Sequence, residues 1–100
     1  MAKNKEVAVI VCTDKRGVFF GYIDVTPEAV MSAKSATLRR ARMCVQWSVA
    51  TKGVLGLASD GPAKGSRVTD EIPAILLDGI HAVLIPTDAA ITRWSDPPWA

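Results

Sequence analysis

Residues 6–25 read EVAVIVCTDKRGVFFGYIDV. The stretch holds two apolar, β-branched runs, 6–13 and 18–25, separated by a polar turn that ends in Gly17. β-Branched and aromatic residues favour strands, and two such runs joined by a short glycine-containing turn are typical of a β-hairpin. The first run is apolar almost without interruption, so we expect burial on both of its faces. Gly21, inside the second run, predicts a bulge or a close approach by another group.

The segments that follow the hairpin predict a short helix and a third strand. Thr26 is a suitable helix N-cap and Pro27 a suitable first helical residue, so residues 26–36 are expected to form a short helix. The apolar residues before Ser48 favour a strand from about Leu38 to Trp47, although the helical pattern would also allow the helix to continue.

The second half of the chain is richer in glycine and predicts shorter elements. One or two helical turns are expected around residues 54–58, and Gly61-Pro62 ends them. The rest of 51–67 is expected to be an extended loop, and no element is assigned to 68–79. A strand over 80–86 and a short helix over 87–94, capped by Thr87, precede a non-helical tail.

Together these elements predict an α+β fold. We expect one small domain over residues 1–100, with a mostly antiparallel sheet of about four to five strands and one to three short helices. The 100 residues are 49% hydrophobic and 22% charged, which is ordinary globular composition.

The charge balance and the apolar runs exclude several classes of partner. Twelve Lys and Arg against ten Asp and Glu leave a net charge of +2, too small for a duplex nucleic-acid binder. The longest apolar runs fall well short of a membrane span, and no secretory signal is visible, so a cytoplasmic protein is expected.

Residues with metal-binding or catalytic chemistry are few. Two cysteines and one histidine cannot form a four-cysteine zinc site or a histidine-rich site within one chain, so no metal and no cofactor is expected. Cys12 and Cys44 lie in apolar segments and are expected to be buried, reduced thiols. His81 lies in an apolar strand and is interpreted as a structural histidine. We therefore expect a binding protein and not an enzyme.

One stretch, Trp47 to Arg67, combines the residue types that a phosphorylated, nucleotide-like molecule needs. Tryptophan offers a flat stacking face, hydroxyls bind sugar or phosphate oxygens, cations neutralise phosphate, and glycines let backbone amides approach it. The predicted ligand-binding residues are Trp47, Ser48, Thr51, Lys52, Gly61, Lys64, Gly65, Ser66 and Arg67. The alternative interpretation is that the glycines serve surface turns and that Trp47 anchors the core.

A basic cluster, Arg39-Arg40-Ala41-Arg42, is the other charged feature. On a regular strand Arg40 and Arg42 would share one face and Arg39 would take the other. The cluster would recognise phosphate, nucleic acid or an acidic partner, or it would simply be a solvated face.

Several segments of the sequence resemble those of a family of short phage and prophage proteins. The pattern runs from Ala41-Arg42-Met43-Cys44-Val45-Gln46-Trp47-Ser48 through Thr51-Lys52-Gly53, Leu55-Gly56-Leu57-Ala58 and Gly61-Pro62 to Gly65-Ser66-Arg67-Val68. His81-Ala82-Val83 and the tryptophan-rich tail are similar too.

The resemblance implies a phage context, in which small proteins often counter host defence. The site residues fit a sponge that sequesters a nucleotide signal. A protein–protein inhibitor of a host defence factor and a minor virion or assembly component remain alternatives. We also expect a homo-oligomer, with Trp94 and Trp99 as interface or clamp residues; the alternative is that the tail packs back on its own sheet.

Overall fold

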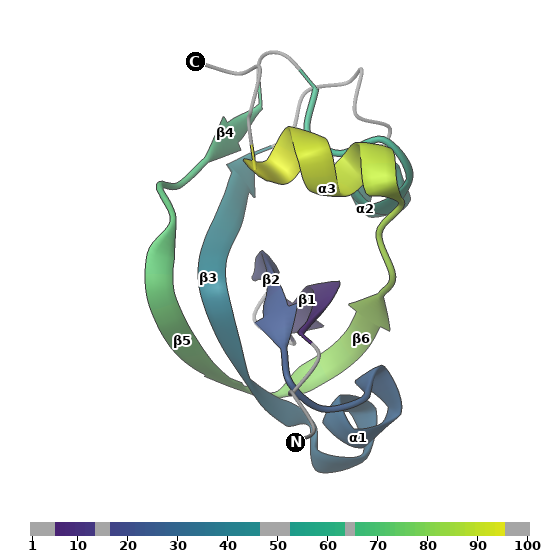
Figure 1. Cartoon of the computed structure of the whole chain (residues 1–100), viewed down its shortest axis with the longest axis vertical. Helices are drawn as coiled ribbons and strands as arrows, with labels where there is room; N and C mark the ends of the chain where they lie inside the picture. Colours follow the sequence, from purple (N-terminus) through teal and green to yellow (C-terminus); the bar gives the residue numbers. More distant parts are fainter. Residues whose placement is uncertain (1–5, 14–16, 47–52, 64–65, 96–100) are drawn as a thin grey trace, which may run out of the picture.

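The structure is a computed structural model that describes residues 6–13, 17–46, 53–63 and 66–95. Within these residues six strands and three helices follow one another along the chain (Figure 1). Their bounds are β1 Val7–Thr13, β2 Val18–Ile23, α1 Pro27–Ala33, β3 Ser35–Gln46, α2 Gly53–Ser59, β4 Arg67–Val68, β5 Ile72–Asp78, β6 Ile80–Leu84 and α3 Asp88–Ser95.

All strand pairings in the sheet are antiparallel. The strand order is β4-β3-β2-β1-β6, and β5 also pairs with β3, next to β4. Gly79 alone separates β5 from β6, and its φ of +69° turns the chain sharply. β5 pairs with β3 and β6 pairs with β1, so the bent segment from β5 through Gly79 to β6 connects the two sides of the sheet, which is strongly curved (Figure 1). The α+β fold predicted from the sequence is confirmed.

Strand β5 has no counterpart among the strands predicted from the sequence. Pro73 lies inside it, and proline in an apolar run usually argues against a strand because it cannot donate a ladder hydrogen bond. β5 tolerates Pro73 because, among the described strands, it pairs only with β3. The sheet therefore contains one full strand more than the sequence pattern indicated.

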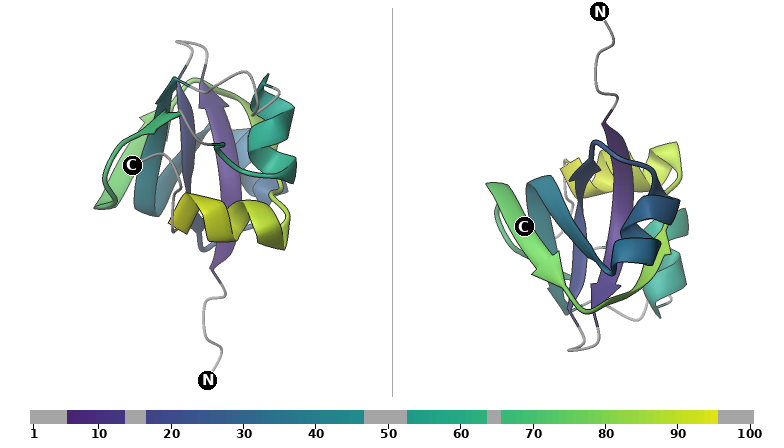
Figure 2. Two further views of the ribbon diagram at one scale, coloured as in Figure 1. Left: turned by 90° about the horizontal axis from the view of Figure 1, so that it is seen from above. Right: turned by 90° about the horizontal axis from the view of Figure 1, so that it is seen from below.

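The predicted hairpin forms, and β1 is buried on both faces. Its register runs from Val7 opposite Ile23 to Cys12 opposite Val18. Val9 and Val11 pack in one apolar cluster, with Val30 of α1. Ile10 and Cys12 pack in the other cluster, against α2 and α3. Figure 2 shows α2 and α3 in the view from above and α1 in the view from below.

Local capping sets the helix boundaries. The Thr26 hydroxyl accepts a hydrogen bond from the Ala29 amide at 3.1 Å, and Pro27 begins α1. Lys34 ends α1 in a left-handed conformation, with φ 57°, so β3 begins at Ser35, three residues before the predicted start. Thr87 caps α3 as predicted, because its hydroxyl accepts a hydrogen bond from the Ala90 amide at 3.1 Å.

Trp94 lies in the core, so the prediction that it serves an interface or clamp is wrong. It is fully buried, and its ring stacks on Phe20 with centroids 5.1 Å apart and an interplanar angle of 8°. Its indole N–H donates to the Leu57 carbonyl at 3.2 Å. An indole buries a large apolar area, which explains why α3 docks on the sheet through this residue. Trp99 lies outside the described residues.

Candidate functional site

Most of the predicted ligand-binding residues lie outside the described part of the chain. These are Trp47, Ser48, Thr51, Lys52, Lys64 and Gly65. The structure describes the other three: Gly61 and Ser66 are buried, whereas Arg67 is exposed.

Gly61 and Ser66 are packed into the protein. Gly61 has φ +85°, and a Cβ there would lie 2.7 Å from Arg93 Cβ, so glycine is needed for α3 to approach. Its amide donates to the Gly56 carbonyl at 3.1 Å, which closes the end of α2. Ser66 is buried, and its amide donates to the Ala63 carbonyl at 3.0 Å. These two amides thus serve local turns.

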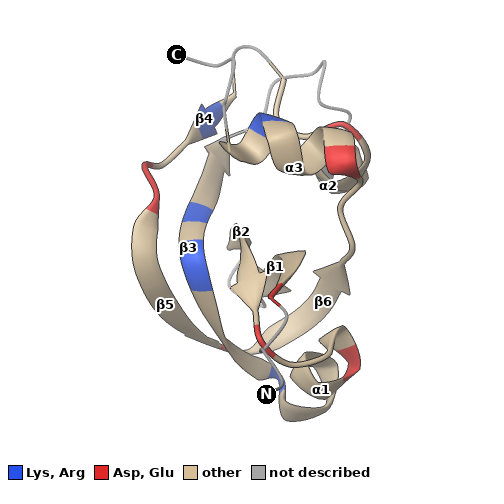
Figure 3. Cartoon of the chain, viewed as in Figure 1, with Lys and Arg blue, Asp and Glu red and all other residues tan. Residues whose placement is uncertain are grey.

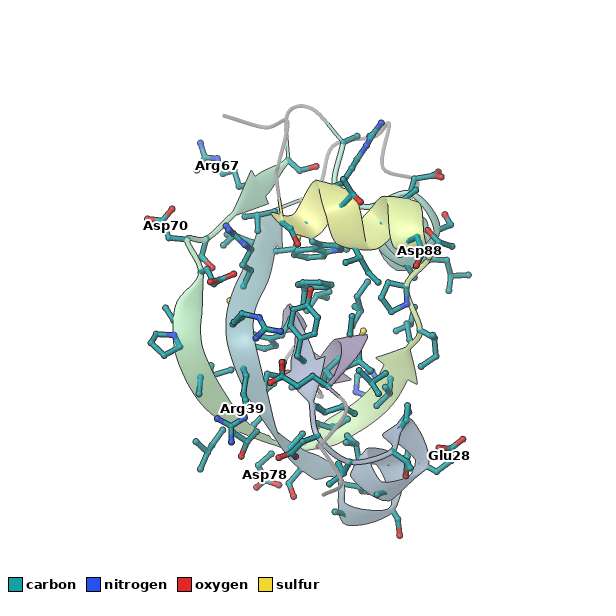
Figure 4. All side chains as sticks on the ribbon, viewed as in Figure 1. Glu28, Arg39, Arg67, Asp70, Asp78 and Asp88 are labelled. Atoms are coloured by element: carbon teal, nitrogen blue, oxygen red, sulfur yellow. The ribbon has the colours of Figure 1, made fainter. Side chains whose placement is uncertain are left out.

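Arg67 is exposed on β4, where it lies opposite Gln46, the last residue of β3. Figure 4 shows its side chain beside β4, on the same flank of the molecule as Arg39. Gln46 is followed along the chain by the 47–52 segment, which lies outside the described residues. The nine-residue site remains a prediction, and Arg67 is its described, exposed member.

The strand that leads to this segment carries the basic cluster. β3 contains Arg39, Arg40 and Arg42, which appear as two blue segments in Figure 3. On β2, Tyr22 lies opposite Arg39 and Phe20 lies opposite Arg42. A step of two residues along β2 therefore corresponds to a step of three residues along β3. This is a β-bulge, which adds one residue to β3 opposite Gly21.

The bulge gives Arg40 an unusual backbone. Its φ is 49°, in the left-handed region that non-glycine residues rarely adopt. Leu38 and Ala41, three residues apart, both pack in the cluster beneath α1. Regular alternation, on which the predicted assignment of the three arginines to faces rested, therefore does not hold across residues 39–42. Gly21 makes room for the bulge, since a Cβ there would lie 2.8 Å from Leu38 Cβ.

Arg40 is held by two neighbours that come from β2 and from the segment before β1. Its guanidinium carbon lies 4.1 Å from the centroid of the Tyr22 ring. Its Nη2 donates to Glu6 Oε1 at 2.7 Å, and this hydrogen bond is the main cause that raises the pKa of Arg40. The Arg40 side chain nevertheless remains 48% exposed. The guanidinium of Arg40 is thus held by Tyr22 and Glu6 and is open to solvent.

Aromatic contacts connect this exposed arginine to the core. Tyr22 meets Phe20 edge to face, with centroids 5.5 Å apart, and Phe20 stacks on Trp94. Edge-to-face and stacked contacts both stabilise aromatic pairs. The series Arg40, Tyr22, Phe20, Trp94 therefore links the basic cluster to helix α3.

Arg39 and Arg42 flank the stacked arginine in different ways. Arg42 Nη1 donates to the Thr69 carbonyl at 3.2 Å and so fixes the connection between β4 and β5. Arg39 is exposed and lies opposite Ala74 of β5. We use the name arginine cluster for Arg39, Arg40, Arg42 and Tyr22.

The arginine cluster suits a ligand that combines a flat heterocyclic ring with an anionic group. A guanidinium presents five N–H donors in a fixed fork that matches phosphate, and its plane also stacks on aromatic rings. In Arg40 the ring of Tyr22 covers one side of that plane. The cluster can therefore combine stacking of a heterocyclic base with hydrogen bonds to a phosphate.

Sequence reasoning identified the three arginines but missed Tyr22 and Glu6. The bulge itself was predicted from Gly21, and the register between β2 and β3 confirms it. The partners of Arg40 depend on the register between β2 and β3 and on the path of residue 6, which no local pattern reveals.

The described nucleophilic side chains lie elsewhere in the structure. Cys12 and Cys44 are both buried, as expected, and burial raises the pKa of the Cys12 thiol. His81 is exposed on β6, and its interpretation as a structural histidine stays a prediction. In the described ranges no group of three or more His, Cys, Asp or Glu side chains is placed to hold a metal ion. In the same ranges, no helix is long and apolar enough to cross a membrane.

Comparison with known proteins gives one match. A family model described as a domain of unknown function, DUF6948, matches residues 6–94, from the residue before β1 to Trp94. No curated protein and no solved structure gives a match.

Proposed function

The chain belongs to the DUF6948 family of domains of unknown function, and we propose that it binds a phosphorylated, nucleotide-like molecule and sequesters it without cleaving it. The observation that carries the proposal is the guanidinium of Arg40, fixed 4.1 Å above the Tyr22 ring and flanked by Arg39 and Arg42. The exposed side of that guanidinium would stack on the base, and the flanking arginines would meet the phosphate.

The expected binding energy is sufficient for a useful affinity. Stacking of a base contributes about 1–3 kcal/mol, and each charge-assisted hydrogen bond about 1.5–3 kcal/mol. One stack and a few such bonds reach the roughly 8–12 kcal/mol of micromolar to nanomolar binding once the costs of association are met. Arg67, opposite the last residue of β3, would supply a further cation.

The non-catalytic part of the proposal is supported by where the reactive groups lie. Cys12 packs in the cluster with Trp94, and desolvation raises its pKa, which disfavours the nucleophilic thiolate. Glu6, the carboxylate beside the arginine cluster, already accepts the Arg40 hydrogen bond.

The biological part of the proposal follows from the resemblance to phage proteins. A sponge for a host defence signal would act in the host cytoplasm, and a homo-oligomer would enclose a small ligand better than one small domain. Light scattering tests the assembly: a monomer at tens of micromolar protein would contradict it. Inhibition of a host protein and a place in the virion are the competing functions, and they predict co-purification with a host protein or presence in purified particles.

Calorimetric titration with cyclic dinucleotides and ADP-ribose-derived signals tests the binding. We expect at least one of them to bind with a Kd below about 100 μM. Arg40→Lys keeps the charge but removes the plane, and Arg39→Ala removes one cation, so each should weaken binding by about tenfold or more. Arg93→Ala, an exposed arginine on α3, is the matched control and should leave the affinity unchanged.

The same titration separates the two parts of the site. Loss of affinity in Lys64→Ala and Arg67→Ala would show that the predicted loop residues share the ligand with the arginine cluster. If no ligand binds, or if Arg40→Lys binds as well as the unaltered protein, the proposed function is wrong.

A further inference from the structure

A groove runs along the inner side of β5, away from the stacked Arg40. At one end a cavity of about 240 Å³ is lined mainly by apolar residues, and Asp70 and Arg42 also border it. At the other end a cavity of about 440 Å³ extends to Asp78 and Gly79. Both cavities are lined by Phe19 and Met43, so they adjoin across these two side chains.

The lining of this β5 groove is apolar in the middle and acidic at its ends. The residues of β5 that line it are Ile72, Ile75, Leu77 and Asp78. Asp70 and Asp78 are both exposed, and Figure 4 shows them near opposite ends of β5. At the Asp70 end the lining also contains Arg42, whose guanidinium donates to the Thr69 carbonyl. The lining at the Asp78 end contains no described cation.

β5 is also an open edge of the sheet, because it pairs only with β3 among the described strands. Natural edge strands are usually protected by charged side chains, bulges or proline. Pro73 gives β5 part of that protection. However, Leu76 is 80% exposed at a position where a protective edge would carry a charge. Leu76 alternates with Ile75 and Leu77, which line the groove, so Leu76 lies on the opposite face of β5.

We propose that the β5 groove binds an extended, basic-ended peptide segment of a partner protein. The eight-residue step from Asp70 to Asp78 spans at most about 26 Å at 3.3 Å per residue. The bound segment would therefore carry Lys or Arg at two positions about eight residues apart. Bulky apolar residues between them would contact Phe19, Ile75 and Leu77. Pockets of this kind give specificity to peptides that run along a strand.

A second copy of this chain does not fit the groove as well. The chain's own pair of cations eight residues apart, Lys34 and Arg42, spans β3, which already pairs with β2 on one side and β5 on the other. Two β5 edges meeting antiparallel would bring like charges together at both ends, which is destabilising.

Fluorescence anisotropy with two labelled synthetic peptides, KKVTVTVTVKK and EEVTVTVTVEE, tests the proposal. We expect the lysine-ended peptide to bind and to weaken with salt, because its ends meet exposed carboxylates. Asp70→Lys/Asp78→Lys should weaken binding by about tenfold or more. Asp24→Lys, an exposed acid outside the groove, is the control and should change it less than about twofold. Amide spectra of both variants verify that they fold.

Apolar contact is tested separately with Ile72→Ser, which should weaken peptide binding, and with its control Ile85→Ser, which should not. In the unaltered protein the peptide should shift amide resonances of β5 and not those of α3. The proposal fails if the glutamate-ended peptide binds equally well, or if the charge-reversed variant keeps its affinity. It also fails if the groove proves to be occupied by a second copy, seen as a dimer that Ile72→Ser dissociates. These outcomes do not depend on nucleotide binding, which Arg40→Lys tests.

Discussion

Removal of the Trp94 indole should destabilise the protein more than any other single change on α3. Trp94 is fully buried, stacks on Phe20 and donates to the Leu57 carbonyl. Truncation of a buried tryptophan to alanine costs about 3–5 kcal/mol. Since small domains are stable by only about 5–15 kcal/mol, Trp94→Ala should be marginally folded.

Trp94→Phe is the graded test because it keeps an aromatic ring on Phe20. It loses the hydrogen bond to Leu57, worth about 1 kcal/mol, and part of the buried area, for a total of about 1–2 kcal/mol. For a domain of this length that loss lowers Tm by about 5–15 °C.

Urea unfolding followed by far-UV circular dichroism measures both losses. Ile85→Ala, at a residue that is 61% exposed, is the control and should change the free energy of unfolding by less than about 0.5 kcal/mol. If Trp94→Ala costs less than about 1 kcal/mol, the docking of α3 through this indole is wrong. The aromatic series also predicts that Trp94→Phe weakens ligand binding, because Phe20 and Tyr22 would lose part of their support beneath Arg40.

Three further predictions concern the bulge and the thiols. Gly21→Ala should lower the free energy of unfolding by about 1–3 kcal/mol, because its Cβ would lie 2.8 Å from Leu38 Cβ and 3.2 Å from the Arg39 carbonyl oxygen; an unchanged urea midpoint would contradict this packing. Arg40→Gly should be about 1–2 kcal/mol more stable than Arg40→Ala, because only glycine adopts φ 49° without steric cost, and equal midpoints for the two variants would argue against the left-handed bulge. Burial raises the pKa of the Cys12 thiol in the folded protein. The stability that the protonated thiol contributes is therefore fully present below the unfolded-state pKa of about 8.5, and it is lost as pH rises through the higher folded-state pKa. Unfolding measured from neutral to alkaline pH should show this loss, and Cys12→Ala should remove that part of the slope.

Elements whose signals are local could be predicted from the order of the amino acids alone. The β-branched runs on either side of Gly17 specify the β1–β2 hairpin, and the cap residues Thr26 and Thr87 specify where α1 and α3 begin. The thiols were predicted to be buried because apolar strand neighbours surround them. Each of these signals lies within a few residues of the feature that it predicts, so no knowledge of distant contacts was needed.

Features that depend on pairing between distant segments could be seen only in the folded protein. Strand β5 forms despite Pro73 because β3 offers it an edge, and Trp94 is buried because Phe20 lies beneath it. Arg40 became the centre of the candidate site through Tyr22 and Glu6, which are 18 and 34 residues away along the chain. The bulge opposite Gly21 changed which residues of β3 are neighbours in space. Such contacts depend on strand register, which is set by the packing of the whole sheet and not by the residues at one position.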